Sequence, residues 1–187
     1  MRIVWSVFGV LLTAILVGSW FYRQPAAQAP TAAPPALPIL AVVEWRPAPT
    51  PPAPRADSLV RFALAQIGTN YCYAGTSPST GFDCSGFVQY VFTRFGVAVP
   101  HSTAALIGTG RPVPRAQARP GDIVVFTGTA PGSTTPGHAG IVISAVGETP
   151  LRFVHSSSAR RESGVKISQV EGSGYEQRFM QVRRVLQ

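Results

Sequence analysis

Cysteine is scarce in this 187-residue sequence, and its scarcity narrows what the protein can be. The two cysteines, Cys72 and Cys84, are too few for a disulfide-based scaffold, and they lack the CxxC spacing of common zinc sites. One cysteine with histidines far along the chain is more typical of a catalytic nucleophile. The cysteines and histidines are therefore the first residues to consider for chemistry.

Lysine is even rarer: Lys166 is the only one, so the formal net charge of +8 comes almost entirely from arginine. A basic balance favours polyanionic partners such as nucleic acid, anionic lipid or an acidic wall polymer. The arginines are scattered, however, and no basic stretch is interleaved with aromatic residues. We therefore expect no nucleic-acid partner.

The N-terminus is the only long apolar stretch, because nearly every residue from Ile3 to Tyr22 is apolar, between Arg2 and Arg23. About 20 apolar residues can span a bilayer as a helix. The aromatic residues at its end suit a membrane interface better than a signal-peptide cleavage site. We predict a membrane helix in residues 1–24, and we favour an uncleaved anchor over a removed signal peptide.

A linker is predicted in residues 25–55, where proline and alanine dominate. Proline-rich chain is extended by about 3.1 Å per residue, so a linker of about 30 residues reaches roughly 90 Å. Such a tether would let a domain work well away from the bilayer, and a disordered spacer of no particular length is the simpler alternative. Residues 56–187 then form the folded domain.

The folded domain shows helical patterns first and strand-like patterns afterwards. Apolar spacing predicts one helix with Asp57 as its N-cap that stops at Gly68, and a second helix from Cys84 to Phe95. Five strand-like runs follow, at residues 122–126, 139–146, 151–155, 165–167 and 179–186. Helices before strands, with short connections, predict an α+β fold with an antiparallel sheet.

The second helix places Cys84 at its N-terminal tip, on a continuous apolar face, with Asp83 positioned as its cap. A helix N-terminus carries partial positive charge and free N–H groups. Both favour a thiolate over a thiol, and the N–H groups could hold an oxyanion. From the helix alone, a small buried cysteine in the core explains Cys84 equally well.

A thiolate nucleophile needs a base, and the base needs an orienting group. His138 opens one strand-like run and His155 closes the next. In a hairpin that turns at residues 146–147, the two histidines would lie directly opposite each other. A turn centred two residues later would leave them about four residues, or on the order of 13 Å, apart and unable to hydrogen-bond. His101 is expected in a loop.

Five segments resemble motifs of the NlpC family of bacterial cell-wall peptidases, in that family's order. Residues 68–88, with their Asp-Cys-Ser-Gly core, resemble the nucleophile region, and residues 100–103 resemble the loop after the nucleophile helix. The strand motifs are residues 120–126, 137–141 and 153–157. In combination these motifs are highly specific, and the resemblance covers the sequence from about Asp57 to the C-terminus.

The resemblance implies a papain-like fold with helices packed on the sheet, and a Cys-His-His triad. Carried over by position, the nucleophile is Cys84, the general base His138 and the orienting residue His155. Tyr71 matches the family tyrosine near the oxyanion hole, and the residues matched to positions near the substrate are Asp83, Ser85 and Ser102. Two departures are Ala74, where the family often has glycine, and His101, where arginine or another polar residue is common.

Members of the family generally cleave stem peptides of peptidoglycan, often between D-glutamate and a diamino acid, or within cross-links. We therefore expect a thiol protease in which the Cys84 thiolate attacks a wall-peptide amide. The Cys84 N–H, with the Tyr71 hydroxyl, would hold the oxyanion, and His138 would protonate the leaving amine and then activate water. We expect no metal or organic cofactor and a monomeric enzyme.

The expected location is the cell envelope, membrane-anchored with the catalytic domain outside the cytoplasm, or secreted or periplasmic if the N-terminal segment is cleaved. Alternatives are a papain-like N-acetylmuramoyl-alanine amidase and a catalytically silent wall-binding protein. A zinc site from Cys72, Cys84 and the two strand histidines is a third alternative, although the spacings match no zinc pattern. We expect no disulfide between the cysteines, because it would consume the nucleophile; a redox switch is the rival hypothesis.

Overall fold

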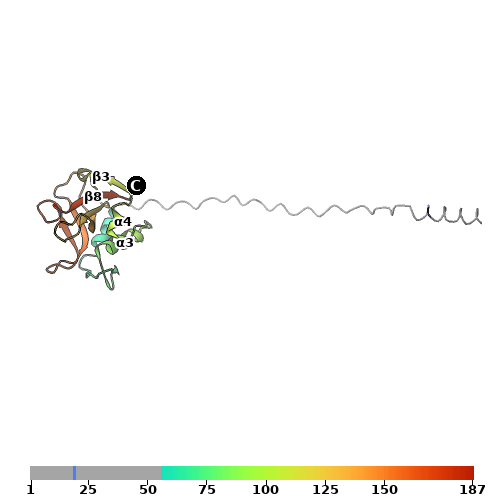
Figure 1. Cartoon of the computed structure of the whole chain (residues 1–187), viewed down its shortest axis with the longest axis horizontal. Coiled ribbons are helices and arrows are strands. Elements are labelled where there is room, and N and C mark those ends of the chain that lie inside the picture. Colours follow the sequence, from blue (N-terminus) through green and yellow to red (C-terminus); the bar gives the residue numbers. More distant parts are fainter. Residues whose placement is uncertain (1–18, 20–55) are drawn as a thin grey trace, which may run out of the picture. The chain divides into compact units, whose positions relative to one another are not determined.

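The computed structural model describes residue 19 and residues 56–187 (Figure 1). The predicted membrane helix and linker, residues 1–24 and 25–55, lie outside the described residues apart from Ser19. Within the part of the chain that is described, no helix is both long and apolar enough to cross a membrane.

The helices of the described domain are α2 (Ala56–Leu64), α3 (Cys84–Arg94) and α4 (Thr103–Leu106), with a 3₁₀ turn, η1 (Arg115–Gln117). The predicted N-cap of the first helix was wrong, because α2 begins at Ala56 and Asp57 lies inside its first turn. The cap of α3 is confirmed. Asp83 has extended backbone geometry there, and its side chain accepts a hydrogen bond from the Gly86 N–H at 2.7 Å.

A six-stranded antiparallel sheet forms the rest of the domain, in the order β3-β8-β4-β5-β6-β7. Its strands are β3 (Arg111–Val113), β4 (Ile123–Thr127), β5 (Pro136–Val142), β6 (Arg152–Ser157), β7 (Gly164–Gln169) and β8 (Phe179–Arg184). A two-strand ribbon, β1 (Thr76–Ser77) and β2 (Gly81–Phe82), precedes α3. Five of the six strands in the large sheet, β4 to β8, were predicted from the sequence. The sixth strand, β3, is a short edge strand, and its proline interrupts the alternating pattern by which a strand is recognised.

The sheet separates two apolar clusters, because successive side chains of a strand point to opposite faces. In β4, Ile123 and Val125 join the cluster that includes the apolar face of α3, whereas Val124 and Phe126 join the other cluster. Helix α3 contacts β5 and β6, and α4 contacts β5. The α+β prediction, with helices packed on an antiparallel sheet, is confirmed.

The pairing of β5 with β6 differs from both predicted registers. Ile141 pairs with Val154 and Val142 with Phe153, so the hairpin is centred between residues 147 and 148. This centre lies midway between the two turn positions considered from the sequence. His155 therefore stands across from Gly140, and His138 is its diagonal neighbour, two residues further along the same face.

Gly140 is required by this arrangement. A Cβ at residue 140 would lie 2.6 Å from Cδ2 of Phe153, 2.9 Å from the Val154 carbonyl oxygen and 3.0 Å from Cβ of His155. Because no side chain occupies the position across from His155, the imidazole of His138 can reach it along the diagonal.

We predict that Gly140→Ala lowers the free energy of unfolding by about 1–3 kcal/mol, since the added methyl group overpacks a site bounded by backbone and a buried ring. Gly174→Ala is the matched control, because a Cβ there would have no neighbour within 4 Å. Urea unfolding of both variants and the parent protein gives the comparison. Equal stability of the two variants would contradict the packing argument.

Candidate active site

Cys84 is the first residue of α3 and lies beside the start of β5. The backbone of Ala139 and that of Ser85 hydrogen-bond to the Cys84 thiol. Burial raises the pKa of this thiol and the neighbouring Asp83 carboxylate raises it further, while backbone hydrogen bonds of Ala139, Ser85 and Cys84 itself lower it, so the net shift is upward. The helix N-terminus was expected to favour the thiolate, but in the folded protein burial outweighs that effect.

The two strand histidines are hydrogen-bonded to each other. Nε2 of His138 lies 2.8 Å from Nδ1 of His155, with the ring planes nearly perpendicular. His155 is completely buried, and its Nε2 lies 2.9 Å from the Oγ of Ser168 in β7. Since His138 uses Nε2 for its partner, its Nδ1 is the nitrogen left to act on another group.

Burial lowers the pKa of both histidines, and the positive charges of Arg178 and Lys166 lower them further. Both imidazoles are therefore neutral at neutral pH. The Cys84 thiol, which hydrogen-bonds to the backbone of Ala139, and the imidazole of the preceding residue, His138, are thus both uncharged at rest.

An aromatic wall covers the histidine pair. The ring of Tyr175 lies 5.6 Å from that of His138 and 5.4 Å from that of His155, and Phe153 is 4.9 Å from His155, measured between centroids. The Tyr175 side chain hydrogen-bonds to Ser157. Such rings keep water away from the bond between the imidazoles.

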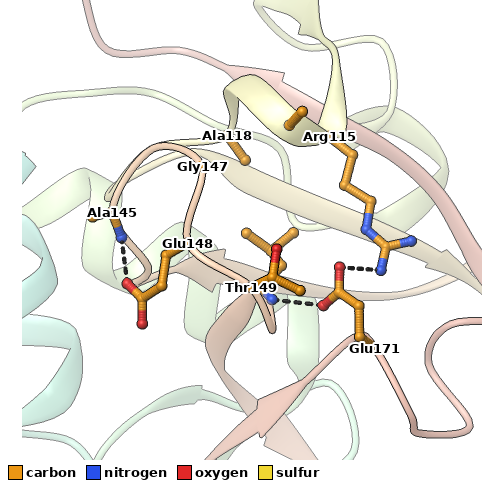
Figure 2. Close-up of a pocket in the computed structure, with 9 residues that line it drawn as sticks. Arg115, Ala118, Ala145, Gly147, Glu148, Thr149 and Glu171 are labelled. Atoms are coloured by element: carbon orange, nitrogen blue, oxygen red, sulfur yellow. Dashed lines mark hydrogen bonds and ion pairs between the residues drawn. The ribbon is translucent and has the colours of Figure 1, made fainter.

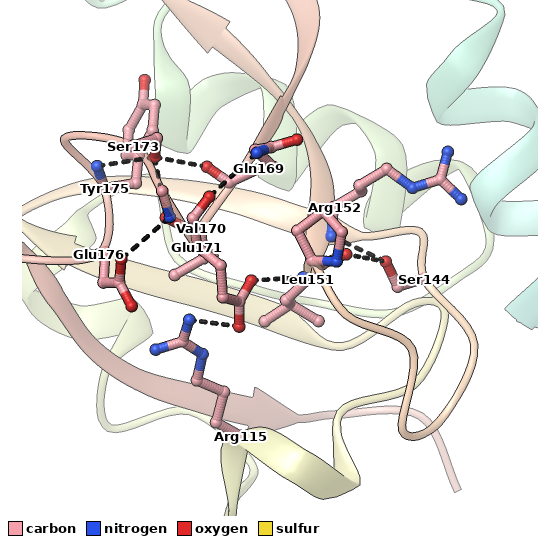
Figure 3. Close-up of polar contacts among 12 residues, drawn as sticks. Arg115, Ser144, Leu151, Arg152, Gln169, Val170, Glu171, Ser173, Tyr175 and Glu176 are labelled. Atoms are coloured by element: carbon pink, nitrogen blue, oxygen red, sulfur yellow. Dashed lines mark hydrogen bonds and ion pairs between the residues drawn. The ribbon is translucent and has the colours of Figure 1, made fainter.

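The loop before β8 holds Tyr175 in place (Figure 3). Ser173 donates through Oγ to the carbonyl oxygens of Gln169 and Val170 and accepts from the Tyr175 N–H. Sequence reasoning missed both Tyr175 and Ser168. The only signal for Tyr175 was a lone aromatic residue in a Gly/Ser-rich loop, and Ser168 had none.

Asp83 gathers a polar cluster at the tip of α3. Besides the Gly86 N–H, its carboxylate accepts a hydrogen bond from Ser85 Oγ at 3.0 Å and lies 3.0 Å and 3.1 Å from Nε2 of His101. His101 lies in a loop, as predicted, but that loop brings it into the site. Ser85 is buried and directed at Asp83.

The other two predicted substrate-binding residues flank this cluster. Burial raises the pKa of the Tyr71 phenol, and the charge of the Cys84 thiolate, when it forms, and that of the Asp83 carboxylate raise it further, so the phenol lies close to both groups. Ser102 is the N-cap residue of α4, and its side chain makes no capping hydrogen bond.

The loop between Tyr71 and β1 is tightly folded. Both cysteines are free thiols, and Cys72 lies in this loop, where Cβ atoms built on Gly75 and Gly81 would each be 2.9 Å from its own Cβ. Ala74 has a φ of 56°, and among the described residues it is the one non-glycine residue with a positive φ. Glycine adopts such a backbone conformation without strain, so the glycine that the family resemblance leads one to expect here would suit this position.

A hollow of about 280 Å³ lies at the turn of the β5–β6 hairpin, the end opposite to the histidine pair (Figure 2). Its carboxylates are already paired: Glu148 with the Ala145 N–H and Arg152, and Glu171 with the Leu151 N–H and Arg115. The Glu148 contacts stay within the hairpin, whereas Glu171 fastens the loop before β8 to the hairpin at Leu151 and to η1 at Arg115. Within residues 56–187, no group of three or more His, Cys, Asp or Glu side chains could hold a metal ion.

The fold and this cysteine–histidine arrangement define a papain-like cysteine hydrolase architecture. The model of the NlpC/P60 family matches residues 68–184, more than half of the chain, and the protein belongs to that family.

Among its relatives, a probable endopeptidase of Mycobacterium tuberculosis H37Rv is 38% identical over 109 residues, which cover 54% of this chain and 26% of that protein. The murein DD-endopeptidase MepS/murein LD-carboxypeptidase of Escherichia coli K12 is 39% identical over 113 residues, 60% of this chain and 54% of that protein. The chain thus spans about a quarter to a half of the length of these curated relatives.

Solved structures agree with the family. An NlpC/P60 family protein from Bacillus cereus superposes with a TM-score of 0.63 at 28% identity, covering 73% of this chain and 42% of that one. The NlpC/p60 domain of the peptidoglycan hydrolase SagA gives a TM-score of 0.54 at 27% identity, covering 70% of this chain and 99% of that domain.

We predict that Asp83→Asn shifts the pH midpoint for alkylation of Cys84 downward, because the nearby negative charge that raises the thiol pKa is removed. Asparagine caps helices about as well as aspartate, so α3 should persist. Iodoacetamide labelling rates from pH 5 to about pH 10, read by mass spectrometry of the Cys84 peptide, measure the shift across the usual thiol range.

Glu162→Gln is the control, since it also removes one negative charge but lies on an exposed side chain paired with Lys166. An unchanged or higher midpoint in Asp83→Asn would show that the carboxylate does not act on the thiol.

Proposed function

We propose that this protein is a cysteine endopeptidase that hydrolyses amide bonds in the stem peptides or cross-links of peptidoglycan. One observation carries the proposal: the Cys84 thiol hydrogen-bonds to the backbone of Ala139, the residue after His138. The neutral imidazole of His138 is in turn hydrogen-bonded to that of His155. The relatives named as endopeptidases, and the one named as a murein endopeptidase, support the same substrate class.

In the proposed first step, the Cys84 sulfur attacks the amide carbonyl while Nδ1 of His138 takes the thiol proton. The negative charge then develops on the carbonyl oxygen at the N-terminus of α3, where the Cys84 N–H and the Tyr71 hydroxyl donate to it. The developing imidazolium needs stabilisation because its surroundings disfavour charge, and Nδ1 of His155 supplies it at 2.8 Å.

His138 next gives the proton to the leaving amine, and the acyl group remains on Cys84 as a thioester. Water enters, His138 removes one of its protons, and the oxygen attacks the thioester carbonyl. Release of the acid product restores the thiol. In this scheme the chain's own residues perform every proton transfer.

The polar cluster at the tip of α3 is the proposed substrate contact. Asp83, Ser85 and His101 are already hydrogen-bonded together there. Tyr71 lies close to Asp83, and Ser102 follows His101 in the chain as the N-cap residue of α4. A carboxylate that also caps the nucleophile helix would couple the fit of the substrate to the position of Cys84. Because His101 already hydrogen-bonds to the Asp83 carboxylate, that carboxylate would bind a substrate amine less strongly, and this would alter which stem end is accepted.

The test is digestion of purified peptidoglycan by the full chain, followed by mass spectrometry of the soluble fragments. We expect peptide fragments cut within stems or cross-links from the parent protein and none from Cys84→Ala, which keeps a small apolar residue at a helix start. Stems released whole from sugar would establish the amidase alternative. Fragments from Cys84→Ala, or none from a folded parent, would refute a Cys84 peptidase.

We also propose that residues 1–24 anchor the protein in a membrane and that residues 25–55 tether the 56–187 domain outside the cytoplasm. The apolar run with its terminal aromatics supports the anchor.

The full chain should therefore fractionate with membranes and retain Met1, as read by mass spectrometry of the mature protein. A soluble form that begins near Pro30 would instead indicate a cleaved signal peptide. The proposed peptidase activity requires only that the domain reach the wall, so this result leaves it unaffected.

A further inference from the structure

Ser168 occupies a position that the proposed mechanism leaves without a role. It lies in β7, directly across from Phe153 and diagonal to His155, with its hydroxyl 2.9 Å from Nε2 of that histidine. Its other side faces a hollow of about 340 Å³ that is lined also by Arg152, Gln169 and Tyr175. Ser168 is thus the polar link between a completely buried imidazole and solvent.

The hydrogen bond between the two histidines can be made in two ways. In one, Nε2–H of His138 donates to Nδ1 of His155, which leaves Nδ1 of His138 with a free lone pair and puts the His155 proton on Nε2. In the other, Nδ1–H of His155 donates to Nε2 of His138, whose own proton then sits on Nδ1. Only the first arrangement leaves His138 able to accept a proton from a thiol.

Which of the two arrangements forms depends on the hydrogen-bond partner of Nε2 of His155. In the first arrangement it is an N–H and needs an acceptor, because burying an unpaired donor is costly. Lys166, directly across from His155 in the strand pair, is a cation bonded to Glu162 and cannot accept. The rings of Phe153 and Tyr175 cover the other sides. The Ser168 hydroxyl, 2.9 Å away, can accept from this N–H while its own proton turns to the adjoining hollow. In the second arrangement the same hydroxyl would donate to Nε2 of His155 instead.

We propose that Ser168 is a positioning residue that holds His155 with its proton on Nε2, and thereby keeps Nδ1 of His138 free to act as the base. The proposal rests on the catalytic roles proposed above for the two histidines. Ser168 acts through His155 and touches neither the nucleophile nor the substrate. It would extend the triad into a row of four side chains: Cys84, His138, His155 and Ser168.

The test compares Ser168→Val with Ser168→Thr in the full chain. Valine and threonine have nearly the same shape and both suit a strand, but only threonine keeps a hydroxyl, and valine also keeps water out of the vacated space. Nitrogen-15 spectra of the three imidazoles report which ring nitrogen carries each proton. The iodoacetamide rate at Cys84 reports whether the base is available.

We expect the parent protein and Ser168→Thr to show His155 protonated on Nε2, and Ser168→Val to show proton density moved to Nδ1. The Cys84 alkylation rate should fall by up to about tenfold in Ser168→Val relative to Ser168→Thr, as for the loss of one hydrogen bond. Ser144→Ala is the control, because it removes a buried serine hydroxyl near the far end of the same hairpin.

Two results would overturn the proposal: a parent protein with the His155 proton on Nδ1, or identical nitrogen spectra and alkylation rates for the valine and threonine variants. The first needs no variant, so the proposal stays testable if Ser168→Val does not fold. If the parent protein fails to digest peptidoglycan but shows the expected spectra, the proposed function is refuted and the role of Ser168 in the histidine pair stands.

Discussion

The diagonal contact between β5 and β6 is the constraint on which this site depends. A hydrogen bond of 2.8 Å joins two imidazoles that are not directly opposite in the strand ladder. It exists because Gly140 leaves the position across from His155 empty, so that His138 can lean into it. The orientation of His138, the proposed base, therefore depends on both the strand register and the absence of a side chain at Gly140.

Burial gives this site its electrostatic character. The same desolvation that raises the pKa of Cys84 lowers the pKa of His138, so both changes favour uncharged partners at rest. In the proposed mechanism, the helix N-terminus and the backbone at Ala139 would matter most once negative charge forms on the sulfur or on the attacked carbonyl oxygen. An aromatic cover over the histidines, fastened by the loop before β8, maintains the low polarity that this balance requires.

Asp83 connects α3 with the residues proposed to contact the substrate. One carboxylate caps α3, holds Ser85 and pairs with His101, while its charge opposes ionisation of the adjacent thiol. Asp83 thus stabilises α3 and also raises the pKa of the thiol of Cys84, the first residue of that helix. His101 in this pair is a departure from the family pattern, and it bears on which peptide ends the proposed enzyme would accept.

The sequence by itself determined the local features: a helix starting at Cys84 with Asp83 as its cap, five of the sheet strands, and the order of motifs that identifies the NlpC/P60 family. These depend on periodicity and on neighbours along the chain. Tertiary structure alone decided the hairpin register, the entry of His101, and the contacts of Ser168 and Tyr175 with the histidines. Those contacts join residues far apart in the chain. Whether they form depends on the strand register, and a shift of two residues leaves every side chain on the same face, so side-chain alternation does not reveal it.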